Sequence, residues 1–336
     1  MTRHLPTEQA ALEAWTKLRS TAVAESTPVE TLQEKRKGCV YRLLGVGHGG
    51  SNVVAKWSSC ERLRRESLAY EEVLPALSVS GVRYYGTLTG SDREGSWLFV
   101  EDAGDEVYSP VVREHRALAA HWLGHLHTSA AAANLACTAR LPDRGDAYYL
   151  RELWSARDEI VRHVANPALN SSDVAVLNAV VRQCEIAASQ WSEVQRICKL
   201  TPPTFIHGDF APKNLRVERI GGVARLRPFD WHGAGWGVPA EDLAQLDVTP
   251  SYWANPDLDV YISTVTRSWP DVTREAVDRL AVTGKLFGSL TRIKQEATGL
   301  GTDWPEGAMK GMRLYKADMD DALSRAGWGV SRRPTT

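Results

Sequence analysis

The chain has 336 residues, of which 43% are hydrophobic and 24% are charged, as in a globular enzyme with one large domain or two modest ones. A formal net charge of -1, without a dense lysine and arginine run, excludes a global attraction to nucleic acid or to an anionic membrane. The five cysteines are odd in number and widely spaced, with no C-x-x-C pair, so the sequence suggests neither a disulfide framework nor a zinc knuckle. We therefore expect a cytoplasmic monomer or homodimer with no nucleic-acid or membrane partner.

The first hundred residues are predicted to be rich in β-strands. Apolar and polar residues alternate in several short runs, and one of the connecting turns is rich in glycine. Glycine and aspartate at 102–105 mark a hinge, so we place a first lobe at residues 1–102. In chain order the predicted elements are a helix at 8–20, strands at 40–44 and 53–57, a helix at 59–74 that ends before Pro75, and strands at 82–88 and 97–101.

The composition turns helical after Pro110. Apolar residues recur there at three- and four-residue spacing over long stretches, which is typical of packed helices. We place a second, larger and mainly helical lobe at residues 103–330. Its predicted elements are helices at 111–132, 147–165 and 172–198, a short apolar run at 204–206, strands at 215–219 and 223–229, and helical sequence from 241 to 326.

The strongest chemical signal is the sequence H-G-D-x-x-x-x-N at residues 207–214, followed by Asp230 after a predicted hairpin. Phosphoryl transfer needs a carboxylate to accept or orient the proton of the acceptor hydroxyl, and hard oxygen ligands for Mg²⁺ on the phosphates. Asp209 suits the first role, whereas Asn214 and Asp230 suit the second. The pattern therefore predicts a phosphotransferase in which Asp209 is catalytic and Asn214 and Asp230 bind the metal.

These motifs resemble the aminoglycoside phosphotransferase and choline kinase-like family, whose members are relatives of the protein kinases. The segment 239–244 resembles the family's sequence after the metal-binding aspartate, in which Asp242 would brace the catalytic loop. The resemblance runs from about residue 38 to about residue 320. It implies an α+β, bilobal protein-kinase-like fold with a small β-rich N-lobe and a larger helical C-lobe. It also implies ATP, or GTP, with Mg²⁺ in the cleft between the lobes.

Two residues of the catalytic loop have open roles. Many members of the family carry His-Pro-Gly before the asparagine, where this chain has Ala-Pro-Lys at 211–213. Lys213 either reaches the γ-phosphate, as a catalytic-loop lysine does in many protein kinases, or is a solvated loop residue. His207 is expected to brace the backbone, because the family assigns proton handling to the aspartate.

A glycine-rich turn, G-V-G-H-G-G-S-N at residues 45–52, connects two predicted strands. Glycine lets backbone N–H groups approach phosphates, but a strand follows and no G-K-[ST] is present, so the turn is neither a Rossmann nor a Walker A loop. In the family this turn covers the phosphates, Lys56 would pair with the α- and β-phosphates, and Glu66 would hold Lys56, with Glu71 and Glu72 as alternatives. The predicted nucleotide contacts here are Gly47, Gly49, Gly50, Ser51, Asn52, Lys56 and Glu66.

The two ends of the predicted site are assigned by region. Residues 98–104 resemble the family's hinge, where adenine would bind backbone groups near Glu101 and Ala103. Acceptor contacts are expected from the 147–165 helix and from the segments after Asp230, because both carry aromatic and charged residues. We select Tyr149, Trp154 and Asp257 there. The acidic residues that either bind a cationic acceptor or form ordinary helix surface are Glu241, Asp247, Asp257 and Asp259.

The acceptor class stays open between related alternatives. The family phosphorylates small-molecule hydroxyls, and our leading expectation is an aminoglycoside-type antibiotic or a related aminocyclitol or sugar, with a role in antibiotic resistance. A metabolic kinase for choline, homoserine, a sugar or a nucleoside is the alternative. A non-catalytic kinase-like binding module would lack Lys56, Asp209 or Asp230, and all three are present. A protein kinase is disfavoured, because H-R-D and A-P-E segments are absent.

Overall fold

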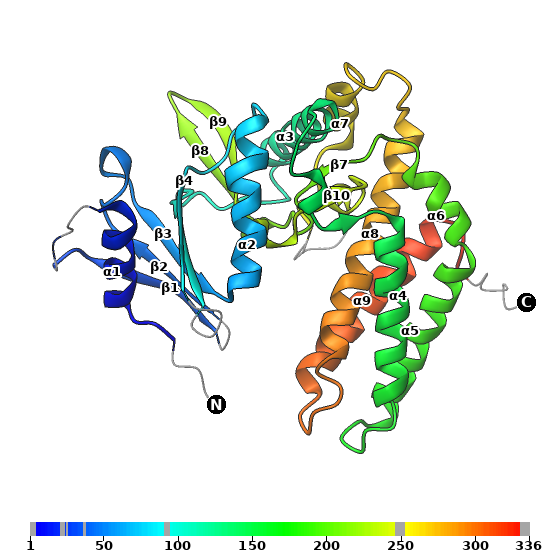
Figure 1. Ribbon diagram of the computed structural model, residues 1–336. Helices are drawn as coiled ribbons and strands as arrows, with labels where there is room; N and C mark the ends of the chain where they lie inside the picture. Colours follow the sequence, from blue (N-terminus) through cyan, green and yellow to red (C-terminus); the bar gives the residue numbers. More distant parts are fainter. Residues whose placement is uncertain are drawn as a thin grey trace, which may run out of the picture. The chain divides into compact units, whose positions relative to one another are not determined.

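The computed structural model describes residues 5–20, 24, 26–35, 38–90, 95–245 and 253–329 (Figure 1). The chain forms two compact units that alternate along the sequence. The first comprises Met1–Tyr108, Ala133–Leu141 and Ala211–Ala234, and the second comprises Ser109–Ala132, Pro142–Phe210 and Gly235–Thr336. The predicted α+β class, with an N-terminal sheet and a larger helical part, is confirmed. The functional boundary between residues 102 and 103 stays a prediction.

A five-stranded antiparallel sheet forms the core of the first unit. Its order is β1 (Val29–Lys35), β2 (Gly38–Leu43), β3 (Val53–Ser58), β5 (Ser96–Glu101) and β4 (Tyr84–Thr89). The sequence predicted β2 to β5 but missed β1. That strand lies at the edge of the sheet, and all its side chains except the first are exposed, so it lacks the apolar alternation that reveals a strand.

The two faces of this sheet carry different side chains, because successive residues of a strand point to opposite sides. Val53, Ala55 and Trp57 share one face with α1 (Glu8–Arg19), which packs its buried Trp15 into the same apolar core. Lys56 therefore points to the opposite face, where α2 (Cys60–Leu68) runs. Figure 1 shows α1 and α2 on the two sides of the sheet.

The helical run that begins with α2 continues through Pro75 instead of ending before it. One π-helical turn, Ala69–Val73, and one 3-10 turn, Leu74–Ala76, follow α2 directly. Pro75 is accommodated because it lies in the first turn of the 3-10 segment, where its missing N–H would have no helical partner.

A hairpin from later in the sequence completes the first unit. Strands β8 (Leu215–Ile220) and β9 (Val223–Pro228) pair antiparallel through a two-residue turn, Gly221 and Gly222, which have φ of 57° and 83°. A turn with two positive φ angles matches the twist of a hairpin, and glycine adopts it without strain. The N–H of Val217 bonds the carbonyl of Glu106, which joins the hairpin to the end of the first segment.

The second unit is mainly helical, with a small sheet of three short strands. Helices α4, α5, α8 and α9 pack side by side, whereas α3 packs against α7 and β7 (Figure 1). The stretch predicted as one helix at 172–198 is two helices, because the chain leaves helical geometry at Gln190. The elements are α3 (Arg113–Ala132), β6 (Asp143–Arg144), α4 (Asp146–His163), α5 (Ser171–Ser189), α6 (Trp191–Cys198), β7 (Thr204–Ile206), β10 (Gly235–Gly237), α7 (Leu258–Val265), α8 (Arg274–Ala297) and α9 (Glu306–Arg325).

No helix within the described residues combines the length and the apolar composition needed to cross a membrane.

Helix α8 packs closely on the backbone of its own unit at Gly284. A Cβ atom added at Gly284 would lie 1.7 Å from the carbonyl oxygen of Ala240. This contact needs a residue without a side chain, and it places α8 directly against the segment that carries Glu241 and Asp242.

We therefore expect Gly284→Ala to lower the free energy of unfolding by about 1–3 kcal/mol, because the added methyl group overlaps a backbone atom that cannot rotate away. Urea unfolding measures the effect. Gly307→Ala is the matched control, since a Cβ at this exposed helical position meets no atom within 4 Å. The control should be neutral or slightly stabilising. Equal stability of the two variants would contradict the close approach of α8.

Candidate active site

The H-G-D segment at residues 207–209, in the second unit, is fixed by a buried aspartate. One carboxylate oxygen of Asp242 accepts the backbone N–H of His207 at 2.7 Å, and the other accepts that of Gly208 at 2.9 Å. The Nε2 atom of His127 lies 3.3 Å from the same carboxylate. Gly208 has φ of 70°, a conformation that glycine adopts freely and that turns the chain just before Asp209. The contacts confirm the bracing role predicted for Asp242.

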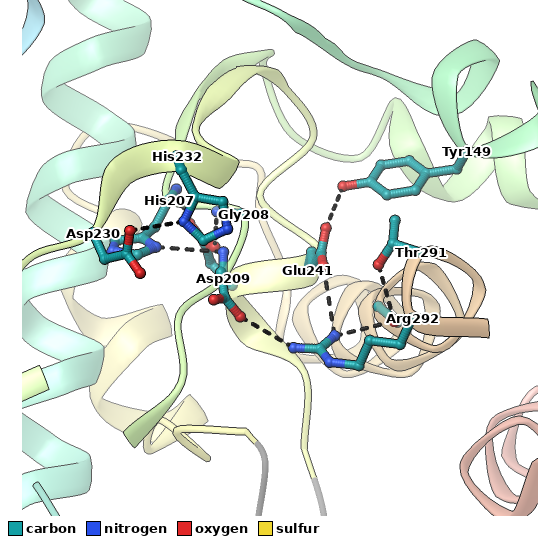
Figure 2. Close-up of polar contacts among 11 residues, drawn as sticks. Tyr149, His207, Gly208, Asp209, Asp230, His232, Glu241, Thr291 and Arg292 are labelled. Carbon is teal, nitrogen blue, oxygen red and sulfur yellow. Dashed lines mark hydrogen bonds and ion pairs between the residues drawn. The ribbon is translucent and has the colours of Figure 1, made fainter. Parts of the chain in front are cut away.

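The side chain of Asp209 is mostly buried and is paired within its unit. It is 13% exposed, and its Oδ1 atom accepts a hydrogen bond of 3.3 Å from the guanidinium of Arg292 on α8 (Figure 2). The backbone N–H of Asp209 points to Nδ1 of His207 at 3.4 Å. His207 is fully buried, its ring is packed edge-on against Phe210, and both observations agree with a bracing residue.

The β8–β9 hairpin of the first unit brings Asn214 close to Asp230. Leu215 pairs with Pro228 at the open end of the hairpin, and the N–H of Phe229 bonds the carbonyl of Asn214 at 3.1 Å. The residues flanking the two strands therefore lie together. The amide of Asn214 is buried, and the backbone of Asp230 is left-handed, with φ of 66°. A non-glycine residue in this region is uncommon and often marks a functional position.

Three charged side chains of the first unit meet beside the sheet. The ammonium of Lys56 lies 2.6 Å from Oε2 of Glu66 and 2.5 Å from Oδ1 of Asp230. The predicted pairing of Lys56 with Glu66 is present. The two alternative partners of Lys56 have other contacts. Glu71 accepts a hydrogen bond from the Tyr84 hydroxyl, and Glu72 pairs with an arginine.

Burial and charge act against each other in this cluster. Burial by itself would lower the pKa of Lys56, but the carboxylates of Glu66 and Asp230 raise it above its usual value. Burial would likewise raise the pKa of Asp230, yet Lys56 and the ring of His232, 2.8 Å away, hold it well below its usual range. The cluster therefore keeps the Lys56 ammonium and the Asp230 carboxylate charged although both groups are largely buried.

The glycine-rich turn is closed by its own backbone. The N–H of Gly47 bonds the carbonyl of Ser51 at 2.8 Å, and the side chain of Asn52 accepts the N–H of Gly45 at 3.0 Å. A Cβ at Gly47 would lie 2.8 Å from the backbone carbonyl oxygen of Ser51, so this position is restricted to glycine. The turn is thus a compact loop between β2 and β3, and its contact with phosphates stays a prediction.

Tyr85 on β4 also holds this turn, although no sequence motif points to this residue. Its hydroxyl accepts the backbone N–H of His48 at 3.0 Å and lies 3.3 Å from the hydroxyl of Ser51. Gly49 and Gly50, which follow His48, have φ of 63° and 80°. The tyrosine therefore fixes one side of a turn whose other residues depend on glycine geometry.

The predicted hinge forms the end of β5. The backbone N–H of Glu101 bonds the carbonyl of Arg83, and its carboxylate pairs with Arg227 at 2.5 Å. Ala103 is buried. Adenine binding at Glu101 and Ala103 stays a prediction, as does phosphate contact by Lys213, whose side chain is exposed.

The residues selected for acceptor binding have contacts within the second unit. Tyr149 is fully buried, its ring stacks on Phe287 at 3.7 Å, and its hydroxyl donates to Glu241. Asp257 caps the N-terminus of α7 by accepting two backbone N–H groups. Only Trp154 keeps an exposed ring, which lies under the guanidinium of Arg157. The acceptor assignments stay predictions, and Tyr149 and Asp257 also have clear structural roles.

The acidic residues proposed for a cationic acceptor are dispersed. Asp247 lies outside the described residues, and Asp259 is exposed at the start of α7, where it pairs with Arg274. Glu241 is buried and accepts the Tyr149 hydroxyl at 2.7 Å. Burial raises the pKa of Glu241 to about 7, even though Arg292, Arg144 and the Tyr149 hydroxyl act to lower it.

This raised pKa has a predictable effect on stability. Between its ordinary value of 4.5 and about 7, Glu241 is protonated when folded but ionised when unfolded, so its contribution to stability falls as pH rises through this window. We expect the free energy of unfolding of Glu241→Gln, relative to wild type, to rise by up to about 3 kcal/mol between pH 5 and pH 8. Urea unfolding at both pH values measures it. The exposed Glu185→Gln is the control, and equal pH dependence in all three proteins would contradict the prediction.

Comparison with known proteins places these features in a family. The model of the phosphotransferase enzyme family matches residues 40–276. No curated protein sequence gives a significant match. A solved mutant of aminoglycoside 2'-phosphotransferase IIIa in complex with GDP is similar, with a TM-score of 0.63 and 15% identity over 93% of this chain and 97% of that chain.

Two further solved structures show the same fold. Choline kinase from Cryptosporidium parvum Iowa II gives a TM-score of 0.58 at 14% identity, over 91% of this chain and 92% of its own. Aminoglycoside phosphotransferase APH(2'')-Ib with bound ADP gives 0.58 at 14% identity, over 93% of this chain and 98% of its own. The protein-kinase-like fold is confirmed. Since the family model covers well over half of the sequence, the chain belongs to the phosphotransferase enzyme family and is an enzyme that transfers a phosphoryl group.

Proposed function

We propose that the protein transfers the γ-phosphate of ATP, with GTP as the alternative donor, to a hydroxyl group of a small molecule. The observation that carries this proposal is the Lys56 ammonium held between the carboxylates of Glu66 and Asp230. A lysine fixed in this way supplies a positioned positive charge for the phosphates of a nucleotide. The bound GDP and ADP named for two of the similar structures support nucleotide use.

The oxygen ligands for Mg²⁺ fit the residues at the hairpin. Asn214 and Asp230 flank the two strands, both offer oxygen atoms, and the Asp230 carboxylate is kept anionic by Lys56 and His232. Mg²⁺ prefers such hard donors and is commonly held by one or two carboxylates together with phosphates and water. When bound, the ion would neutralise charge on the phosphates, and Asn214 and Asp230 would hold it.

Asp209 supplies the remaining chemistry in this proposal. Its carboxylate would orient the acceptor hydroxyl and accept its proton as the phosphoryl group transfers. Asp242 makes this geometry reproducible, because its two hydrogen bonds fix the backbone of the two preceding residues. The glycine-rich turn would cover the phosphates, and backbone groups near Glu101 and Ala103 would bind the base.

For the acceptor, we propose an aminoglycoside-type antibiotic or a related aminocyclitol or sugar, which would give the enzyme a role in antibiotic resistance. The names of two similar structures support this class, and the choline kinase supports a metabolic alternative. The exposed ring of Trp154 offers an aromatic surface for a sugar ring. All five cysteines are buried and none of them forms a disulfide bond, which fits the cytoplasmic location that we propose.

An acceptor screen tests the function. Purified protein is incubated with ATP or GTP and MgCl₂ and with single aminoglycosides, amino alcohols, nucleosides and sugars, while nucleoside diphosphate release is followed by a coupled assay. We expect one class to stimulate release, with a phosphorylated product detected by mass spectrometry. Lys56→Met is the control that separates transfer by this site from a contaminating kinase. Product formation at an equal rate by Lys56→Met would reject the proposed site.

A further inference from the structure

Arg292 on α8 contacts the catalytic loop and is itself held on several sides (Figure 2). Its guanidinium donates to Asp209 at 3.3 Å and to the carbonyl of Gly288 at 3.0 Å. The guanidinium also lies 3.8 Å from the carboxylate of Glu241 and 4.1 Å from the ring centroid of Trp253. Only 13% of the side chain is exposed. An arginine with this many partners has little freedom to move.

The space around Arg292 is shaped for this arrangement. A Cβ at Gly288, one helical turn before Arg292, would lie 1.9 Å from the ring of Trp253. The glycine therefore makes room for the indole ring that supports the guanidinium. An arginine over an aromatic face is held by cation–π attraction while its planar N–H groups stay directed at oxygen atoms.

Glu241 is held in place as well. Its carboxylate accepts the hydroxyl of Tyr149 at 2.7 Å, and the ring of Tyr149 stacks on Phe287, one residue before Gly288. The carboxyl group of Glu241 and the carbonyl of Gly288 together constrain the orientation of the guanidinium. In that orientation the second amino group meets Asp209.

We infer that Arg292 is a positioning residue for phosphoryl transfer, which aligns the carboxylate of Asp209 and favours its charged form. The inference rests on the proposed function, in which Asp209 accepts the proton of the acceptor hydroxyl. A carboxylate must be ionised and correctly directed for that role, and a neighbouring cation favours the ionised form. Small misplacements of a catalytic group are costly, because transfer depends on reacting atoms being in line.

The other charged and titratable groups of this unit surround the same cluster. Burial raises the pKa of Asp318 on α9, although the charges of Lys285 and Arg292 act to lower it. Arg144 and Tyr148 also lie near Glu241. His207 lies beside the backbone of Asp209. Arg292 also acts to lower the pKa of Glu241 and of Asp318, so the test below follows the carboxyl carbon of Asp209 itself.

Two variants and one control test the inference. Arg292→Gln removes the charge, and Arg292→Lys keeps the charge but loses the planar fork. Arg274→Gln is the control, because Arg274 lies at the exposed start of the same helix and pairs with Asp259 and Asp278. Thermal unfolding confirms that each protein is folded.

The first measurement needs no acceptor. The carboxyl carbon of Asp209 is followed by ¹³C NMR against pH in the nucleotide-free protein, with the signal assigned from Asp209→Asn. We expect Asp209 to titrate at a higher pH in Arg292→Gln than in wild type, and at the wild-type pH in Arg274→Gln. Identical titration in wild type and Arg292→Gln would overturn the inference.

The second measurement follows kcat against pH with ATP, MgCl₂ and the acceptor found in the screen. We expect kcat of Arg292→Gln to fall about tenfold or more, with its acid limb moved to higher pH, nucleotide KM within about twofold, and Arg292→Lys intermediate. A lower kcat without a shifted limb would indicate a structural role, and a raised acceptor KM with unchanged kcat would indicate acceptor binding; either would overturn the inference. A wild-type protein that phosphorylates no acceptor would reject the proposed function, and with it the role in transfer.

Discussion

Asp209→Asn is expected to reduce turnover by about 10²-fold or more while leaving the fold and nucleotide affinity nearly unchanged. Asparagine has almost the shape of aspartate and can still accept the hydrogen bond from Arg292, but it cannot take up the proton of an acceptor hydroxyl. The backbone of the loop is fixed through Asp242, so the substitution removes chemistry and keeps geometry. Steady-state kinetics with an identified acceptor and calorimetry with a nucleotide measure the two quantities.

The control for this experiment is Asp158→Asn. Asp158 is an exposed residue of α4 that pairs with the neighbouring Arg157, and its replacement should leave both quantities unchanged. Near-wild-type turnover by folded Asp209→Asn would remove Asp209 from its catalytic role. A large loss of nucleotide affinity would instead assign it to the donor.

Asp230→Asn is expected to weaken magnesium-dependent nucleotide binding by at least about tenfold. Asparagine tolerates the left-handed backbone of this position, with φ of 66°, whereas alanine would add strain. Lys56 keeps Glu66 as a partner, so the cluster loses one carboxylate and no more. Calorimetry with a non-hydrolysable ATP analogue, with and without MgCl₂, separates the metal contribution from the rest.

A matched control is Asp278→Asn, an exposed helical position paired with Arg274. It should bind nucleotide as wild type does at every magnesium concentration. If Asp230→Asn kept both its affinity and its dependence on magnesium, another residue would hold the metal.

The sequence predicted those parts of the site that are written in short motifs. The bracing of His207 and Gly208 by Asp242 and the pairing of Lys56 with Glu66 were expected, and both are observed. Such motifs are readable because a fixed chemistry requires fixed residue types at fixed spacing. The strands with a buried face were predicted for a related reason, since burial imposes alternation on the sequence.

Residues that act through tertiary contacts do not belong to a short sequence motif and were not predicted. Arg292 is 83 positions from Asp209, on a helix whose pattern only reports packing. Tyr85 looked like one more aromatic residue of a strand. Tyr149 was selected by its region and its aromatic side chain, and its burial depends on Phe287, which lies far along the chain. The edge strand β1 was missed because its exposed residues show no apolar alternation. The break at Gln190 was missed because the helical pattern of apolar residues continues across it.

The alternation of the two units along the chain has a consequence for synthesis. Lys56 is separated from Asp230 by 174 positions, so the sheet and α2 leave the ribosome long before the hairpin that supplies their third charged partner. Until then Lys56 and Glu66 lack the carboxylate of Asp230, and residues 106–108 lack the strand β8 to which they bond. Contacts of such long range are formed late and slowly. An N-terminal fragment ending near Tyr108 should therefore depend on chaperones, and nascent chains should become resistant to protease only after residue 234 has emerged.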